Sequence, residues 1–366
     1  MQQFLAPALA FMLAFIFTPL MRRLALRVGA MDHPGGRKIH GHAMPLLGGV
    51  AVYLSFWITA ALILTFMPGG EKLRGLFLGS SLILALGLYD DIRGLSYKAK
   101  FAGQFVAALI LLAYNIRIEF ITLPFQNMVF LGAFIVPLTL LWVVGVTNAV
   151  NLADGVDGLA TGICIIAAAV MCALTFENFP LISLLALCLA GAALGFLPHN
   201  FAPARIFLGD SGSLFLGFML AAFSIMNVTK QATFTTLVIP VLILGLPICD
   251  TCYAMWRRLR GRRPIFQADN GHIHHRLLNM GLGPRRTVLV LYFSSIYFGA
   301  AAIAFERVTL GVSNVYFIPL VFAVFALGLK YMDSVGALLS AAGISLTPGK
   351  GKKEATGEEY KKHFPS

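Results

Sequence analysis

The chain has 366 residues, of which 58% are hydrophobic and only 12% are charged, and its formal net charge is +12. Soluble domains carry about 25% charged residues, so this composition excludes an ordinary soluble enzyme, a disordered chain and a disulfide scaffold. The basic excess first suggests a nucleic-acid partner, but the charges lie between long apolar runs, which indicates a multi-pass membrane protein with no nucleic-acid partner.

Eleven apolar runs predict membrane-spanning helices, because about 20 apolar residues cross a bilayer as a helix. The third run is short for this purpose. The predicted fold class is an all-α polytopic membrane helical bundle of about 11 transmembrane helices. Residues 1–331 form one integral-membrane domain and residues 332–366 a cytoplasmic basic, polar tail. The expected spans are 3–21, 46–67, 75–89, 101–116, 129–147, 159–176, 181–197, 212–228, 234–256, 288–305 and 314–331.

The basic residues are distributed unevenly between the two sides of these spans. Twenty-three of the 28 lysines and arginines fall in every second connection or in the tail, and five fall in the other connections. Cytoplasmic loops carry the excess of positive charge, so we expect the N-terminus outside and the C-terminus in the cytoplasm. All nine aspartates lie on or near the same predicted side, which favours an anionic or metal-binding cluster there over turn preference alone.

Polar motifs interrupt the apolar pattern on this side, beginning with Arg37, Lys38 and His40 before the paired glycines Gly48-Gly49. Glycines permit a close approach of a helix or a nucleotide. The adjacent carboxylates of Asp90-Asp91 follow, ahead of Lys98 and Lys100. Because like charges repel, such a pair needs a cation or a base nearby, unless it is only a hydrated helix end.

The run from Asn148 to Gly158 places Asn148, Asn151, Asp154 and Asp157 three residues apart after a wholly apolar span. This spacing offers several oxygen ligands within about one and a half helical turns. It does not match the calcium-binding loop of an EF-hand. The segment from Phe207 to Ser213 then opens the eighth span. Its small residues would offer free N–H groups to a phosphate, or Asp210 would cap the helix.

Asp250 lies inside the ninth predicted span, where an ionisable residue is either functional or paired with an arginine such as Arg257 or Arg258. The following loop, 257–287, carries eight arginines and three histidines. Arginines beside a membrane suggest an anionic lipid or a diphosphate, or they only set the topology. The histidines lack a carboxylate or thiol at a fixed spacing, so substrate hydrogen bonding is favoured over zinc.

Four of these segments together resemble the polyprenyl-phosphate N-acetylhexosamine-1-phosphate transferases, closest to the WecA-type undecaprenyl-phosphate N-acetylglucosamine-1-phosphate transferases. The segments are Asp90-Asp91, 148–158, 207–213 and 257–275, in the order and spacing of the family. The resemblance covers nearly the whole chain. It implies a helical bundle in the bacterial cytoplasmic membrane, with its active cleft on the cytoplasmic face.

The resemblance also implies a reaction in which undecaprenyl phosphate attacks a UDP-N-acetylhexosamine, most simply UDP-GlcNAc, and UMP is released. Magnesium, or manganese in its place, would be held by Asn151 and Asp210, and Lys100 would contact the diphosphate. A homodimer is compatible with the family. The other implied residues are Asp90, Asp91, His272, His274 and His275 for catalysis, and Lys38, Asn148, Asp154, Asp157 and Arg276 for substrate binding.

Two alternatives stay open on the sequence. A phospho-muramoyl-pentapeptide transferase is the nearest enzymatic competitor, although the order His-Ile-His-His favours a simpler amino-sugar donor. A transporter or lipid flippase is the alternative of another class. It would place polar residues near the middle of the membrane, whereas the carboxylates here lie at the ends of spans. The sequence does not select O-antigen, common antigen or teichoic acid as the polysaccharide served.

Overall fold

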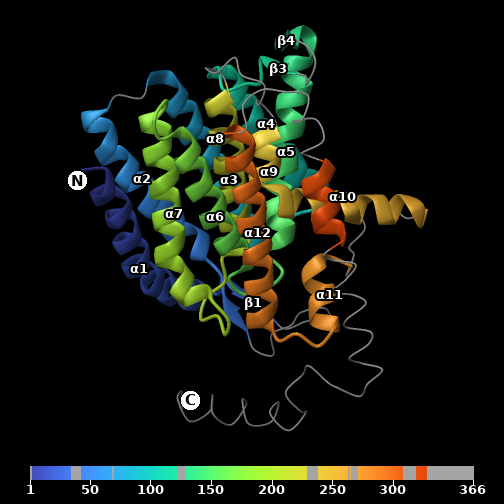
Figure 1. Ribbon diagram of the computed structural model, residues 1–366. Coiled ribbons are helices and arrows are strands. Elements are labelled where there is room, and N and C mark those ends of the chain that lie inside the picture. Colours follow the sequence, from blue (N-terminus) through green and yellow to red (C-terminus); the bar gives the residue numbers. More distant parts are fainter. Residues whose placement is uncertain are drawn as a thin grey trace.

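Long helices dominate the structure, because apolar runs in a bilayer must satisfy their backbone hydrogen bonds internally. The computed structural model describes residues 2–33, 43–67, 70–122, 128–228, 238–262, 264, 271–307 and 319–327. Most of the long helices run along one common axis (Figure 1). The helices are α1 (Gln2–Val28), α2 (Gly48–Phe66), α3 (Gly70–Arg93), α4 (Tyr97–Ala113), α5 (Ile135–Ala153), α6 (Leu159–Thr175), α7 (Pro180–Asn200), α8 (Gly209–Val228), α9 (Val238–Ile243), α10 (Gly245–Arg260), α11 (Ile273–Asn279) and α12 (Pro284–Arg307).

Seven helices in the described part of the chain are long and apolar enough to cross a membrane, and the shorter apolar helix α6 packs among them. The protein is therefore a polytopic membrane helical protein. The number of eleven spans and the orientation stay predictions. The expectation that the third span is short is wrong. Helix α3 has 24 residues, since it continues through the polar residues at both ends of its apolar run.

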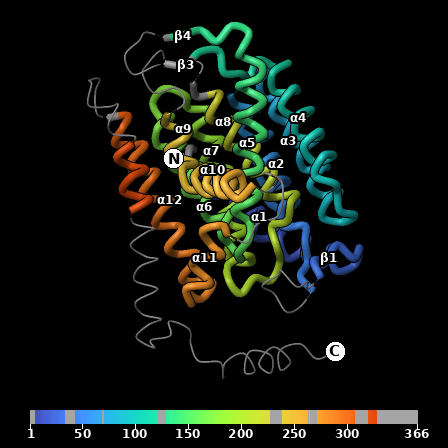
Figure 2. The backbone as a smooth tube through the Cα atoms, turned by 90° about the vertical axis from the view of Figure 1, so that its right-hand side faces the viewer, coloured from blue at the N-terminus to red at the C-terminus, as the bar shows by residue number. Residues whose placement is uncertain are grey.

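The ninth predicted span, 234–256, is not one helix. Its described part is divided at Leu244 into the short helix α9 and the helix α10. Pro247 lies in the first turn of α10, where its missing N–H is tolerated. Gly245 packs against the ring of Phe298, which a side chain at position 245 would strike. Helix α10 consequently lies across the axis of the bundle, and Figure 2 views it nearly end-on.

Two small antiparallel sheets depart from the predicted all-α class. Strands β1 (Met31–Asp32) and β2 (Met44–Pro45) pair with each other, as do β3 (Phe120–Thr122) and β4 (Met128–Phe130). A short 3-10 helix, Gly132–Phe134, precedes α5. The pair β3–β4 lies at one end of the bundle, while β1 and α11 lie at the other (Figures 1 and 2). Each sheet pairs segments that connect helices, and the helical architecture is otherwise unchanged.

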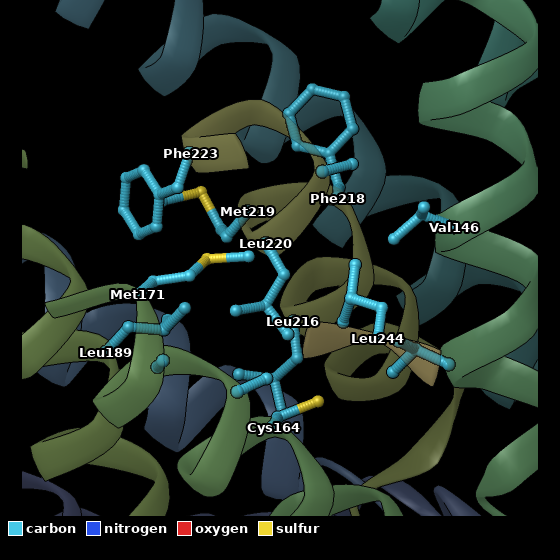
Figure 3. Packing of buried hydrophobic residues seen from close by; sticks show 14 of the residues in the cluster. Val146, Cys164, Met171, Leu189, Leu216, Phe218, Met219, Leu220, Phe223 and Leu244 are labelled. Atoms are coloured by element: carbon cyan, nitrogen blue, oxygen red, sulfur yellow. The ribbon is translucent and has the colours of Figure 1, made fainter. Parts of the chain in front are cut away.

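Helix α8 forms the centre of the core. Its residues 214–223 are almost all fully buried, and it packs against α2, α3, α5, α6 and α7. Figure 3 shows Leu216, Phe218 and Leu220 of α8 among side chains from surrounding helices. Large apolar side chains on the outer helices, such as Phe15, Leu141 and Phe293, are instead exposed. An apolar exterior around a buried central helix is what a bilayer environment requires.

The connections that hold the polar motifs meet at one end of the bundle. Gly48 and Gly49 donate backbone hydrogen bonds to the carbonyl oxygens of Phe207 and Leu208, at 3.1 and 2.9 Å. The backbone N–H of Phe207 donates to the carbonyl oxygen of Pro45 at 2.9 Å. These bonds place the start of α2 directly beside the turn that opens α8. The same end carries the C-terminus of α3, the N-terminus of α4 and the C-terminus of α5.

Candidate functional site

A cluster of charged side chains occupies this end of the bundle. We call Asp90, Asp91, Lys100, Asn151 and Asp210 the lysine–aspartate cluster. The ammonium group of Lys100 contacts the carboxylates of both Asp90 and Asp210. The side-chain amide of Asn151 donates to Oδ1 of Asp210 at 3.2 Å. Four helices, α3, α4, α5 and α8, thus each contribute a polar group to one half-buried site.

Asp90 and Asp91 have different partners although they are adjacent in the sequence. Asp90 contacts Lys100 and accepts a hydrogen bond from the backbone N–H of Leu95. The two oxygens of Asp91 accept from the backbone N–H groups of Asp210 and Ser211, at 2.8 and 3.1 Å. These donors belong to the first turn of α8, where the helix itself leaves them unpaired. Asp91 therefore caps α8.

This cap corrects one expectation from the sequence. The N–H groups at positions 210 and 211 are not free for a phosphate, because Asp91 accepts from both of them. Asp210 is not the cap of its own helix, and its carboxylate points instead to Lys100 and Asn151. Gly209 has a φ of +72°, and a Cβ there would lie 2.6 Å from Oδ2 of Asp91. Only glycine fits this turn without strain.

Two further glycines bring the backbones of α2, α3 and α8 into contact beneath the cluster. A Cβ added at Gly49 would lie 2.1 Å from the backbone nitrogen of Gly212. A Cβ added at Gly87 would lie 2.5 Å from Cα of Ser211. The three helices can converge this closely only because these positions lack side chains. Backbone contact therefore fixes the start of α8 relative to Asp90 and Asp91.

The segment from Asn148 to Gly158 borders the cluster and is anchored at several points. Asn148 pairs through its side-chain amide with Gln104 of α4. Asp157 accepts a hydrogen bond from the backbone N–H of Ala204 at 2.9 Å, and Tyr292 donates to the carbonyl oxygen of Gly158 at 2.6 Å. Burial, together with the charge of Asp210, raises the pKa of Asp154 well above its ordinary value.

Residues 271–276, which we call the histidine segment, form the other wall of this end. His274 is buried, and its ring centroid lies 4.3 Å from that of the half-buried His275. A Cβ added at Gly155 would lie 2.4 Å from Nε2 of His274, so this ring covers the backbone of the 148–158 segment. Arg276 points its guanidinium toward the ring of Tyr253 on α10, 5.9 Å from the centroid.

Comparisons with known proteins show the family of this chain. The Glycosyl transferase family 4 profile matches residues 73–228, which contain three of the four motifs. A Bacillus subtilis (strain 168) protein named "Probable undecaprenyl-phosphate N-acetylglucosaminyl 1-phosphate transferase" is 38% identical over 310 residues, covering 84% of this chain and 86% of its own length. This chain belongs to glycosyl transferase family 4.

Other members of the family differ in the polyprenyl phosphate or in the sugar group that their names state. The "Decaprenyl-phosphate N-acetylglucosaminephosphotransferase" of Mycolicibacterium smegmatis is 34% identical over 331 residues, covering 81% of this chain and 80% of its own length. A "Phospho-N-acetylmuramoyl-pentapeptide-transferase" of Listeria welshimeri is 33% identical over 305 residues, covering 78% of this chain and 92% of its own length. The recognition of polyprenyl-phosphate phosphosugar transferases from four motifs is therefore confirmed.

The structure brings most of the residues that the family pattern implies to one end of the bundle. Lys38 lies outside the described residues. Sequence reasoning missed Gln104, the partner of Asn148, and the capping role of Asp91. A polar residue four positions after Lys100, on an apolar helix, was a signal for Gln104. The capping role had no such signal, because it depends on two N–H groups more than a hundred residues away along the chain.

Proposed function

We propose that the protein transfers N-acetylglucosamine 1-phosphate from UDP-N-acetylglucosamine to undecaprenyl phosphate at the cytoplasmic face of a bacterial membrane, releasing UMP. The observation that carries this proposal is the contact of Lys100 with both Asp90 and Asp210, beside Asn151. The relatives named above support the phosphosugar chemistry and the polyprenyl acceptor. The product would supply synthesis of a surface polysaccharide such as O-antigen, common antigen or teichoic acid.

The reaction forms one bond and breaks one. An oxygen of the lipid phosphate bonds to the phosphorus that carries the sugar. The bond from that phosphorus to the bridging oxygen then breaks, and UMP departs with this oxygen. Such transfers depend mainly on positioning and on neutralising charge. Lys100 supplies a fixed positive charge for the diphosphate, and Asp90 and Asp210 fix the position of its ammonium group.

The donor groups of the cluster fit a divalent cation with oxygen ligands. Among the described residues, no three His, Cys, Asp or Glu side chains converge as a ready-made metal site. Magnesium, however, is usually held by one or two carboxylates together with water and substrate phosphates. Asp210, with Asn151 against it, supplies such ligands, and Asp154 is repelled by Asp210 and Asp91, an excess of negative charge that a cation offsets. Bound magnesium, or manganese, would polarise the diphosphate.

The remaining residues would bind the donor. Asp154 and Asp157 lie in the segment that we assign to the nucleotide, where Asp157 keeps this segment against residue 204. His274 faces this segment from the opposite wall, and His275 lies against the ring of His274, which suits contacts to the sugar and the phosphates. The carboxylates lie where polar connections meet the ends of helices, and this arrangement favours an interfacial enzyme over a transporter.

The decisive experiment measures UMP release by the purified full-length protein in detergent. We expect release from UDP-N-acetylglucosamine that requires both undecaprenyl phosphate and magnesium, with a lipid-linked sugar diphosphate identified by mass spectrometry. Donors that carry N-acetylgalactosamine or the muramoyl pentapeptide complete the panel. Faster turnover of the pentapeptide donor would instead assign the protein to the phospho-N-acetylmuramoyl-pentapeptide transferases. No UMP from any donor would overturn the enzymatic proposal and favour transport.

A separate experiment tests the side of the membrane. In a variant without the five native cysteines, a cysteine introduced between residues 279 and 285 should react in intact cells only with membrane-permeant reagents. A cysteine introduced between residues 307 and 313 should react with impermeant reagents, because the basic residues place that connection outside. The reverse labelling would contradict a cytoplasmic site.

A further inference from the structure

Asp250 is a buried carboxylate outside the lysine–aspartate cluster. It lies in the second turn of α10, and only 7% of its surface is exposed. A buried charge is costly unless hydrogen-bonding partners compensate for the water that it loses. The chain breaks at Leu244 before α10, and Asp250 on this helix finds its hydrogen-bonding partners in the histidine segment.

Both oxygens of Asp250 are used by the histidine segment. Oδ2 lies 2.8 Å from Nδ1 of His272, and Oδ1 accepts a hydrogen bond from the backbone N–H of Ile273 at 2.9 Å. His272 is only 5% exposed and occupies the position directly before α11, where its side chain makes no capping hydrogen bond. A carboxylate only accepts hydrogen bonds, so Nδ1 of His272 carries the ring hydrogen that is donated to Asp250. Asp250 thus fixes both the ring of His272 and the backbone that follows it.

The ring of His272 in turn lies against His274. The two rings are parallel within 6°, and their centroids are 5.8 Å apart. His274 is 3% exposed, and its Nε2 has no hydrogen-bond partner among the described residues. This nitrogen faces Gly155, in the segment assigned to the nucleotide. A buried nitrogen without a partner carries an energetic penalty that a bound polar ligand removes.

We propose that Asp250 is a positioning residue for the transfer reaction: it fixes His272 and the start of α11, and thereby aims the unpaired nitrogen of His274 at the nucleotide-sugar beside Gly155. His272 then acts through its neighbours and does not itself touch the substrate. This inference rests on the proposed function. It names an acidic residue outside the four motifs as part of the machinery that recognises the donor.

The test compares Asp250→Asn with the wild-type enzyme in the UMP-release assay. Asparagine has nearly the same shape, and its oxygen can still accept from Ile273. Its NH₂ group, however, would face Nδ1 of His272 and require the other ring tautomer. We expect the KM for UDP-N-acetylglucosamine to rise and kcat to fall, each by roughly tenfold, as for the loss of a carboxylate that orients a functional histidine. The KM for undecaprenyl phosphate should stay unchanged.

A second comparison asks whether Asp250 and His272 act as one unit. The double variant Asp250→Asn with His272→Gln should be no slower than the slower single variant. The effects of substitutions within one hydrogen-bonded network are not additive. Thr251→Val is the matched control on the same helix turn and should keep wild-type kinetics. Thermal melting of each purified variant separates loss of the fold from loss of positioning.

The outcomes are distinct. If Asp250→Asn melts at a lower temperature but keeps both KM values and kcat, or if the two substitutions multiply each other's effects, Asp250 is a structural residue only and the inference is overturned. If the wild-type enzyme releases no UMP, the proposed function fails together with the inference. A rise in the KM for the sugar donor and a fall in kcat, with an unchanged KM for undecaprenyl phosphate and an unchanged melting temperature, support the positioning role.

Discussion

The lysine–aspartate cluster and the histidine segment lie at the same end of the bundle, yet they are fixed in different ways. The cluster stands on helices whose backbones touch at Gly49, Gly87 and Gly212. The histidine segment is fixed chiefly by side chains, with Asp250 as the anchor on a helix that lies across the bundle. Backbone contact gives the cluster a preset geometry, whereas a single substitution can release the histidine segment.

The largest effect is expected for the carboxylate at the centre of the cluster. Asp210→Asn removes the charge that faces Lys100 and the proposed metal while keeping the shape of the side chain. Turnover should fall by about 1000-fold or more, because electrostatic stabilisation is the main contribution to phosphoryl transfer. The dependence of UDP-sugar binding on magnesium should weaken. Glu177→Gln is the control, because Glu177 lies just beyond the end of α6 that is far from the cluster. An unchanged magnesium titration of Asp210→Asn would contradict a role in metal binding.

The next largest effect distinguishes the roles of the two adjacent carboxylates, Asp90 and Asp91. Asp90→Asn and Asp91→Asn should each lower kcat by about 10- to 100-fold, and by the same factor at pH 6 and pH 8.5. The lipid phosphate has a second pKa of about 6. Above that pH it is already deprotonated, so a general base that removes its proton would accelerate the reaction little. Only Asp91→Asn should also lower stability, by about 1 kcal/mol, since it caps α8. A defect that is severe at pH 6 and relieved at pH 8.5 would identify a general base instead.

Close backbone packing under the cluster predicts an effect on stability. Gly87→Ala places a methyl group against Ser211 and should cost about 1–3 kcal/mol of unfolding free energy, as overpacked cores do. Gly145→Ala is the matched control, because a Cβ at position 145 meets nothing within 4 Å. Melting temperatures of the two variants in detergent measure the difference. Equal melting temperatures would show that α3 and α8 can move apart without penalty.

The smallest expected effect is a pH dependence of the unfolding free energy that arises from His274 in the histidine segment. Burial lowers the pKa of His274 to about 4 from its ordinary value of 6.5. Below pH 6.5 the unfolded chain binds a proton that the folded protein does not bind, so stability declines as the pH falls toward 4. The expected loss at pH 5.5 is about 1 kcal/mol relative to neutral pH. His274→Gln should flatten this dependence in melting experiments. The same slope in variant and wild type would contradict the burial of His274.

Much of the organisation was readable from the sequence for a simple physical reason. A bilayer admits only helices of about 20 apolar residues, so apolar runs identify most of the long helices, and four polar motifs between them identify the family. The division of the ninth span was not visible in this way. Its apolar composition continues through Gly245 and Pro247, and only the tertiary structure, with Gly245 packed against Phe298, shows where the chain turns.

The roles within the site were decided by the tertiary structure. The sequence alone marked Asp90, Asp91, Asp210 and the histidines as polar groups at the ends of apolar runs. It did not separate Asp91, which caps α8, from Asp90, which contacts Lys100, because their partners lie on other helices. Nor did it join Asp250 to His272. Hydropathy is a property of each segment by itself, whereas a hydrogen bond between distant segments exists only after the helices have packed.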